Sequence, residues 1–417
     1  MSEYINNREK RIEALLSFSM GMMEGKDGKT LIDKYSDAIE NITPHDIIEM
    51  EDRQVKKGVE VSKIKKHIEK IMNVFNPYLE KYEWDKPQKG HPLFYLMKEN
   101  KELKIFLNET KEVIKKIEFD SDVDKNEEMN NLKEHLRKLQ KFDKHYVRKE
   151  NILFPYLEKK WDNYRPLQVM WSLHDDIRKG LKELLELLEE ENKLNNEIRK
   201  KFGQLFLTMY RMVFKEEKII FPIAMETLNK KEWQEIQEQS LEEGYIFIDS
   251  PQKDDMIIKE EKRKEKNKQT SNTSADFSLE GVFLGLGTGN LSLEQIKLMI
   301  NNLPVDITYV DENDKVRFFS NPEERFFPRS KAIIGRDVQN CHPPESVHIV
   351  ENILESFKSG EKDKARFWIQ MKGKFILIEY FALRDDFDNY RGTIEVSQEI
   401  SEIRELKGEK RLLDWNK

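Results

Sequence analysis

The chain carries the motif Lys149-Glu-Asn-Ile-Leu-Phe-Pro155 twice, and the second copy, Glu216-Glu-Lys-Ile-Ile-Phe-Pro222, follows 67 residues later. Each copy lies near the C-terminal end of a long amphipathic stretch, the second and the fourth of four such stretches between residues 92 and 229. Four long helices joined by short turns are typical of an antiparallel bundle. The second and fourth helices of such a bundle run in the same direction, so we expect Glu150 and Glu217 to reach the same depth.

Histidines accompany the repeated glutamates. His91 begins the first stretch, His145 lies in the second and His174 lies in the third. Bundles hold metal pairs with inward carboxylates at one level, and a buried glutamate is costly unless it is paired or coordinated. Imidazole and carboxylate ligands suit iron, manganese or zinc. The sequence therefore predicts a metal site formed by His91, His145, Glu150, His174 and Glu217.

Three features of the motif leave this prediction open. His145 and Glu150 are about 140° apart around an ideal helix, and a π-bulge would be needed to bring them together. Lys149 lies four residues after His145 in place of a carboxylate, and Met212 stands where the second copy would have a histidine. Glu216 is the alternative ligand if the repeat is aligned one residue off. The competing hypothesis is a metal-free bundle in which the motif glutamates form salt bridges with neighbouring lysine and arginine side chains.

The remaining sequence divides into parts of different composition. Residues 1–83 have apolar residues three and four apart, which predicts a small helical module before the bundle of residues 84–245. Residues 246–290 are rich in charged and small polar residues and predict a flexible linker. Alternating apolar residues on both sides of polar loops predict an α+β domain over residues 291–400. Residues 401–417 predict a charged helical tail, so the expected fold class is mainly α with an α+β C-terminal domain.

Composition narrows the classes of function. The 417 residues include 72 Lys and Arg against 79 Asp and Glu, a formal net charge of −7, so there is no basic footprint for nucleic acid. Charged residues make up 36% of the chain, which suits long helices with solvated faces. Cys341 is the only cysteine, which excludes an internal disulfide and cysteine-ligated clusters. No stretch has the roughly 18 consecutive apolar residues of a membrane helix, and we expect a cytoplasmic protein.

Several segments of the predicted bundle resemble the hemerythrin-like, HHE cation-binding family. They are Gly90-His91-Pro92, His145 to Pro155, Trp171-Ser-Leu-His174-Asp175 and Lys215 to Pro222. The resemblance implies that the bundle binds a non-haem di-iron centre. It thus agrees with the metal site that the histidines and glutamates predict on their own.

The two flanking parts also resemble known domains. Residues 1–83 look like a bacterial helical domain catalogued as domain of unknown function 438. Residues 296–400 look like a PAS domain through Val305 to Asp314, Ile334-Gly335-Arg336 and Asn340-Cys-His-Pro-Pro344. PAS domains are sensory or dimerising modules, so this resemblance implies a sensor. Cys341 and His342 are weak candidates for haem ligands, and the sequence does not identify a PAS ligand.

We therefore expect a sensory or regulatory protein that binds iron in its bundle and responds to oxygen, nitric oxide, redox state or iron. Oxidation would change the ligation between Glu150 and Glu217, shift the helices and bias their contacts with the flanking domains. The signal would leave through a partner protein that the sequence does not identify, or through a PAS-mediated homodimer. Two alternatives stay open: a di-iron oxidase or peroxidase-type enzyme, which ranks below the non-catalytic sensor, and a metal-free interaction scaffold.

Overall fold

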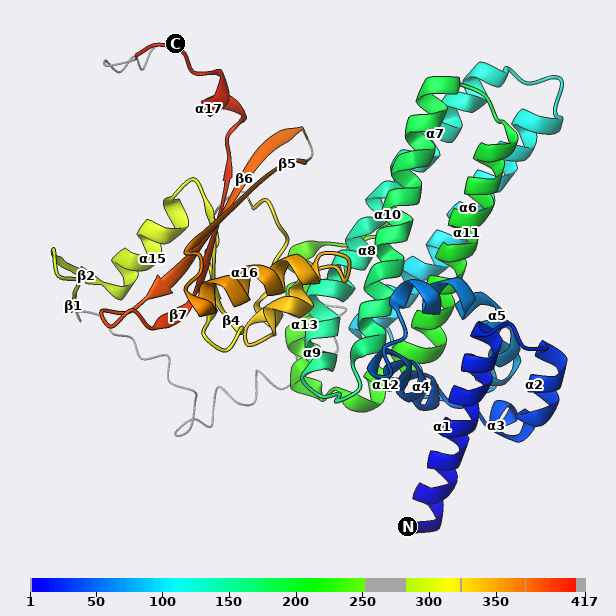
Figure 1. The fold of residues 1–417 in the computed structure, drawn as a ribbon. Helices are drawn as coiled ribbons and strands as arrows, with labels where there is room; N and C mark the ends of the chain where they lie inside the picture. Colours follow the sequence, from blue (N-terminus) through cyan, green and yellow to red (C-terminus); the bar gives the residue numbers. More distant parts are fainter. Residues whose placement is uncertain (1, 252–282, 323–324, 372, 410–417) are drawn as a thin grey trace, which may run out of the picture. The chain divides into compact units, whose positions relative to one another are not determined.

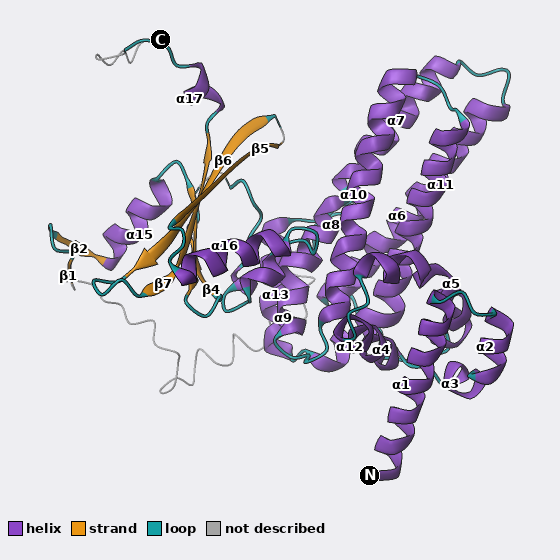
Figure 2. Cartoon of the chain, in the orientation of Figure 1, coloured by secondary structure: helices purple, strands orange, loops and turns teal. Residues whose placement is uncertain are grey.

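The structure is a computed structural model that describes residues 2–251, 283–322, 325–371 and 373–409. These residues form two compact units. The helical unit contains the first 251 residues, and the C-terminal unit contains most of the residues from 283 onward (Figure 1). The described regular elements of the helical unit are all helices, whereas the C-terminal unit combines strands and helices (Figure 2).

The first part of the helical unit is a small helical module. Its helices are α1 (Ser2–Met23), α2 (Gly28–Lys34), α3 (Ser36–Glu40), α4 (Pro44–Lys56) and α5 (Val61–Leu79). Thr43 caps α4 in a capping box with Asp46, and a proline occupies the first turn. The rings of Phe18 and Phe75, whose centroids are 5.4 Å apart, join α1 to α5 in the buried core.

The second part is an antiparallel four-helix bundle, as the two motif copies predict. Its first and third helices are α6 (Pro92–Phe119) and α10 (Arg165–Glu191). The second consists of α7 (Lys125–Lys141), α8 (Asp143–Arg148), η1 (Lys149–Leu153) and α9 (Phe154–Glu158), and the fourth of α11 (Asn196–Lys215), η2 (Glu216–Ile220) and α12 (Phe221–Thr227). An additional helix, α13 (Lys230–Glu243), packs against α6, α8 and η1. The apolar sides of bundle and module merge into one hydrophobic core.

Ion pairs also join the N-terminal module to the bundle. Lys215 of α11 donates to both oxygens of Glu51, at 2.9 and 3.0 Å, and both side chains are buried. Arg165 at the start of α10 donates to Asp52 at 3.0 Å. Breaking a buried pair by removing one partner is strongly destabilising. These contacts therefore hold α4 against the bundle as part of a single unit.

The C-terminal unit is built on an antiparallel sheet. Its strands are β3 (Asp306–Asp311), β4 (Val316–Phe319), β5 (Lys364–Met371), β6 (Lys374–Arg384) and β7 (Tyr390–Glu399), in the spatial order β4-β3-β7-β6-β5. β1 (Phe283–Gly285) and β2 (Asn290–Ser292) form a separate hairpin. The helical segments from residue 293 onward are α15 (Leu293–Asn302), η4 (Lys331–Ile333), η5 (Val338–Cys341), α16 (Val347–Ser359) and α17 (Ser401–Glu405).

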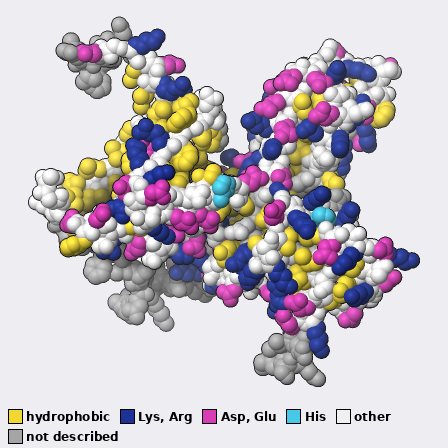
Figure 3. Space-filling model, viewed as in Figure 1, with side chains coloured by type: hydrophobic (Ala, Val, Ile, Leu, Met, Phe, Trp, Pro, Cys, Tyr) yellow, Lys and Arg dark blue, Asp and Glu magenta, His cyan; other side chains and the backbone are white. Residues whose placement is uncertain are grey.

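The core of the C-terminal unit lies between its sheet and the helical segments η5 and α16. Val310 and Val316 from β3 and β4 pack there with Val338 and Leu354. Strand β3 pairs with β7 so that Tyr309 lies opposite Ile394. Figure 3 shows hydrophobic side chains at the surface of this unit, whereas cationic and anionic side chains are interspersed over the helical unit. The charged faces of the long helices thus account for much of the charge in the composition.

The structure confirms the fold class that the sequence predicts, including the order of the strands and helices in the C-terminal unit. The predicted linker of residues 246–290 falls largely on residues 252–282, which lie outside the described residues. The predicted tail of residues 401–417 includes residues 410–417, which also lie outside them. The predicted domain boundaries stay predictions.

No helix in the described ranges is long and apolar enough to cross a membrane.

Candidate functional site

A network of buried charged side chains lies in the bundle at the level of the two motif copies. Lys149 is its centre: the ammonium group donates to a carboxylate oxygen of Glu216 and lies 3.1 Å from Nε2 of His174. All three side chains are completely buried. Lys149 and Glu216 are equivalent positions of the 67-residue repeat. The two motif copies are therefore joined across the bundle by an ion pair between their first residues.

Both motif copies form a turn of π-helix. The five-residue spacing from His145 to Glu150 requires such a turn if both side chains are to point the same way, and the sequence alone did not show whether one is present. The N–H of Phe154 bonds to the carbonyl of Lys149 in η1, and the N–H of Phe221 bonds to that of Glu216 in η2. A proline follows each phenylalanine, and a proline inside a helix clashes with the carbonyl four residues earlier. That carbonyl lies within the π turn in both copies, where the wider helix gives it room. The same turn lets both Lys149 and Glu150 reach the network.

His145 connects two of the buried carboxylates. Its Nδ1 lies 2.7 Å from Oε2 of Glu99 on α6, and its Nε2 lies 3.0 Å from Oε2 of Glu216. A carboxylate only accepts hydrogen bonds, so both ring nitrogens donate and the contacts assign an imidazolium cation. Glu99 also accepts from Arg148, and Glu216 accepts from Asn100 at 2.8 Å. Each carboxylate at this level is thus neutralised by cations of the chain itself.

His174 connects the centre to a second ion pair. Its Nδ1 donates to Oε1 of Glu150 at 2.6 Å, which leaves Nε2 as the acceptor for Lys149. Arg178, one turn later on α10, donates to both oxygens of Glu150 at 3.0 and 2.9 Å. The ring of Tyr146 stacks on His174 with centroids 4.3 Å apart. Burial, with the nearby cations, lowers the pKa of His174 well below its ordinary value, so the imidazole is neutral.

The two residues of the central pair respond differently to burial. Burial lowers the pKa of Lys149, and the neighbouring Glu216 acts against that effect. For Glu216 burial alone would raise the pKa, but the positive charges of Lys149 and His145 outweigh it and hold the pKa well below the ordinary value. The carboxylate is therefore ionised at neutral pH and faces an ammonium group. The pair is a buried salt bridge that joins the two motif helices.

These side chains do not fit a bound metal ion. Within the described residues, no three His, Cys, Asp or Glu side chains are grouped so that they could hold one. His145, Glu150 and His174 do belong to the network, but each is committed to a hydrogen bond there, and the Lys149 ammonium lies against the nitrogen of His174 that would otherwise be a ligand. The carboxylates Glu99, Glu150 and Glu216 of the network already face the cations His145, Arg148, Lys149 and Arg178, and Arg178 also pairs with Asp143 and Asp175.

His91, a predicted ligand, has a different role from the network residues. Its Nδ1 accepts from the N–H of Leu93 at 3.1 Å, so the side chain caps the N-terminus of α6. The ring packs edge-on against Trp233 of α13, with centroids 4.5 Å apart. Its Nε2 is buried and has no hydrogen-bond partner among the described residues. Burial lowers the pKa of His91 to about 4.

The lowered pKa of His91 predicts a loss of stability in acid. Between pH 6.5 and 4 the unfolded chain binds a proton at His91 that the folded chain does not, so stability is present above pH 6.5 and falls as the pH decreases toward 4. A shift of this size corresponds to about 3 kcal/mol. His91→Asn keeps a capping side chain but cannot titrate. Chemical denaturation at pH 7 and pH 4.5 should show a smaller loss for the variant than for the wild type, and equal losses would contradict the prediction.

Glu217, the other predicted ligand outside the network, pairs with Lys104 of α6 at 3.4 Å. Burial raises its pKa, and Lys104 acts against that effect. Glu217 is the repeat counterpart of Glu150, yet the two glutamates pair with separate cations. Met212, the counterpart of His145, is buried among apolar side chains. Of the five predicted ligands, His145, Glu150 and His174 therefore lie in the network, whereas His91 and Glu217 lie outside it.

Sequence reasoning missed two members of the network and underrated others. Glu99 and Arg178 are charged residues on amphipathic helices, and nothing in the pattern marks them as buried partners. Arg148 was expected as a salt-bridge partner of the motif glutamates in the metal-free bundle, and it pairs with Glu99. Lys149 and Glu216 did carry a signal. They are the first residues of the two motif copies, and each lies four residues after His145 or its counterpart Met212. Residues four apart share a helix face, so this spacing identifies the pair that points into the bundle.

Cys341 and His342, the weak haem candidates, lie beside the core of the C-terminal unit. The His342 Nδ1 is 2.8 Å from the carbonyl oxygen of Val338, and the Cys341 thiol points to the carbonyl of Asp337 at 3.7 Å. Burial lowers the pKa of His342. The cavity that His342 lines measures about 30 Å³, far below the roughly 300–1,000 Å³ of ordinary ligand pockets. This cavity does not accommodate a haem.

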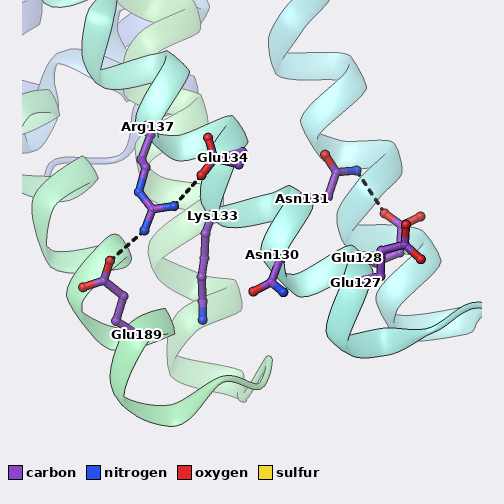
Figure 4. Close-up of a pocket in the computed structure, with 8 residues that line it drawn as sticks. All are labelled: Glu127, Glu128, Asn130, Asn131, Lys133, Glu134, Arg137 and Glu189. Atoms are coloured by element: carbon purple, nitrogen blue, oxygen red, sulfur yellow. Dashed lines mark hydrogen bonds and ion pairs between the residues drawn. The ribbon is translucent and has the colours of Figure 1, made fainter.

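A broad hollow of about 610 Å³ lies over α7 and α10 and is lined by polar side chains (Figure 4). Arg137 lies between Glu134 and Glu189 and donates to them at 2.5 and 3.0 Å. Asn131 donates to Glu128 at 3.1 Å. These groups are exposed, and exposed ion pairs contribute little to stability or binding. The hollow is a solvated helix surface, in contrast to the buried network.

Two family models match the chain. Residues 91–224 match the model described as hemerythrin HHE cation binding domain, and residues 296–401 match a model described as PAS domain. The first match contains both motif copies, and the second contains the five-stranded sheet. The two matches support a sensory or regulatory role. The likeness of residues 1–83 to domain of unknown function 438 stays a prediction.

Three solved structures are similar to part of the chain. The C-terminal domain of a protein from Streptococcus mutans is 33% identical, with 30% of this chain and 98% of that chain covered and a TM-score of 0.29. The PAS domain of a protein from Colwellia psychrerythraea is 16% identical, with 26% and 98% covered and a TM-score of 0.22. The PAS domain of BvgS from Bordetella pertussis is 16% identical, with 27% and 89% covered and a TM-score of 0.23. No curated protein matches the chain.

Proposed function

We propose that this chain is a sensory or regulatory protein whose helical bundle works without a bound metal. The observation that carries the proposal is the position of Lys149, which pairs with Glu216 and His174 at the centre of the network. An ammonium group there, paired with Glu216, supplies the positive charge that buried carboxylates require. The bundle is then a scaffold locked by its own ion pairs, and it presents its surfaces and the N-terminal module to a partner.

A second candidate is the iron-dependent sensor that the sequence predicts, and the cation-binding description of the matching family model favours it. In that form His145, Glu150 and His174 would have to leave their present hydrogen bonds to become ligands. Lys149 would have to move away from His174 at the same time. The energetic cost of breaking several buried charge contacts together argues for the metal-free form. A di-iron enzyme would face the same cost.

Metal analysis of the full chain distinguishes the two forms. The protein is produced in iron-supplemented medium, purified without oxygen and analysed for iron, manganese and zinc, with its visible spectrum recorded before and after exposure to air. We expect a substoichiometric metal content, no visible band and an unfolding midpoint that neither Fe²⁺ nor a chelator changes. Stoichiometric iron with a spectrum that responds to air would contradict the metal-free form and establish the second candidate.

A further inference from the structure

A cavity of about 340 Å³ lies in the helical unit, where α5 of the N-terminal module meets helices α10 and α11 of the bundle. Its volume falls within the roughly 300–1,000 Å³ of ordinary small-molecule sites. All three helices belong to one compact unit, so the walls of the cavity are held together. The central residues of the charged network do not line the cavity, so a ligand here would leave them in place.

One part of the cavity wall is apolar. Ile68 and Met72 come from α5, Leu173 comes from α10 and Phe214 comes from α11. Ile68, Met72 and Leu173 are almost completely buried, and Phe214 packs against the same core. Side chains from three helices thus form a surface on which the hydrocarbon part of a ligand would be removed from water.

The charged side chains of the wall already have partners within the chain. Lys65 forms an ion pair with Asp176 at 2.8 Å. Lys215 donates to both oxygens of Glu51, and Arg211 has an interaction of its own. A charged ligand would therefore lose its hydration without gaining an oppositely charged partner, and that loss is costly. The wall thus favours an uncharged ligand.

The last turns of α5 at this wall are short of hydrogen-bond donors. The side-chain oxygen of Asn76 is buried and has no hydrogen-bond partner in the described part of the chain. The next residue, Pro77, lies inside the helix. Because proline has no N–H, the carbonyl of Asn73, another wall residue, lacks the donor that the helix would otherwise supply. A buried acceptor without a partner costs free energy, and a ligand that donates a hydrogen bond to Asn76 would remove that cost.

We propose that this cavity binds a small uncharged alcohol, whose hydroxyl group donates to Asn76 and whose hydrocarbon body lies against Met72 and Phe214. The inference rests on the proposed function, because it gives the metal-free helical unit an organic ligand as its sensory input. The occupant contacts α5, α10 and α11 together and so stabilises the contact of the module with the bundle. Lys215, at the cavity wall, directly precedes Glu216 of the network, which connects the cavity to the π turn of the fourth helix.

Calorimetric titration of the full chain tests the proposal with three probes. They are n-octanol, its isomer heptyl methyl ether, which has the same atoms but no hydroxyl group, and octanoate, which carries a charge. We expect n-octanol to bind saturably at one site and the ether to bind about fivefold more weakly, because the donated hydrogen bond is lost. Octanoate should bind at least about tenfold more weakly than n-octanol, because burial of its carboxylate is not compensated.

A variant of the acceptor tests the role of the hydroxyl group. Asn76→Leu removes the side-chain oxygen and keeps the approximate size of the side chain. It should lower the affinity for n-octanol about fivefold, to that of the ether, and leave the affinity for the ether unchanged. Retained ether binding shows that the cavity is still formed in the variant.

Two tryptophan variants locate the site. Thr208→Trp places a large ring at a residue that lines the cavity and should abolish binding of n-octanol and of the ether. Gln204→Trp makes the same change one turn earlier at an exposed position and should leave binding unaltered. Both variants should keep the helical circular dichroism spectrum of the wild type.

Four outcomes would overturn the proposal. Absence of saturable n-octanol binding rejects the site, and binding that survives Thr208→Trp rejects the location. Equal affinities of the wild type for n-octanol and the ether reject the donated hydrogen bond, and octanoate that binds as tightly as n-octanol rejects the uncharged ligand class. None of these results depends on metal content. If the chain binds n-octanol as expected but also contains stoichiometric iron, the proposed metal-free function fails while the alcohol site stands.

Discussion

Replacing Lys149 with methionine is expected to lower the free energy of unfolding of the helical unit by about 3–5 kcal/mol, the cost of leaving a buried charge without its partner. Methionine has a similar length and no charge, so it leaves the Glu216 carboxylate without its ammonium donor and the His174 Nε2 without its hydrogen bond. Urea denaturation followed by circular dichroism measures the loss. The spectrum of the folded variant reports whether the bundle still forms.

A double-mutant cycle separates this ion pair from a general effect of the substitution. Glu216→Gln removes the charge on the other side, and the double variant Lys149→Met with Glu216→Gln should lose less stability than the two single variants together, because neither charge is then left alone. Lys104→Met is the matched control, since its partner Glu217 lies 3.4 Å away in a half-exposed pair. Such pairs contribute about 1 kcal/mol or less. Additive losses, or equal losses in Lys149→Met and Lys104→Met, would show that the central pair is not the stabilising element.

The double variant Lys149→Glu with Met212→His is expected to convert the bundle into a metal-binding protein. The first change places a carboxylate four residues after His145, and the second places an imidazole four residues before Glu216, so each motif helix offers two donors on one face. His174 then loses its lysine neighbour and has a free ring nitrogen. Paired carboxylate and imidazole donors from facing helices are the ligand set of bundle metal sites.

Metal binding by this variant is measured after anaerobic addition of Fe²⁺ or Co²⁺ and removal of excess ion. Metal content should rise from a substoichiometric to a stoichiometric level, and the cobalt form should show visible absorption bands. The control is Lys149→Met with Met212→Leu, which removes the ammonium group but adds no donor, and it should remain metal-free. A folded double variant that retains no more metal than this control would mean that some feature other than Lys149 and Met212 prevents binding.

The sequence predicted the elements of this protein well because their patterns are local. The periodicity of apolar residues located the four bundle stretches, and the alternation around polar loops located the strands of the C-terminal unit. The repeat identified the level of the bundle at which polar chemistry occurs, and both copies do form π turns at that level.

Local patterns did not predict which buried charges pair with one another. Adjacent residues on a helix point about 100° apart. An alignment of the two motif copies that is wrong by one residue therefore replaces a residue of the buried network with a neighbour that lies outside it. That is the difference between Glu216, which pairs with Lys149, and Glu217, which pairs with Lys104. Arg178 and Glu99 could not be assigned in advance, because a charged residue on an amphipathic helix has the same local pattern whether it faces solvent or a buried partner.

By itself, then, the amino-acid sequence determined the helices, the strands, the repeated motif and the depth at which its side chains meet. Only the tertiary structure decided that an ammonium group, that of Lys149, lies among the donors predicted to bind a metal. The physical reason is that contacts along one helix depend on spacing alone, whereas contacts between helices depend on their rotation and relative height. Those two quantities are set by the packing of the whole core.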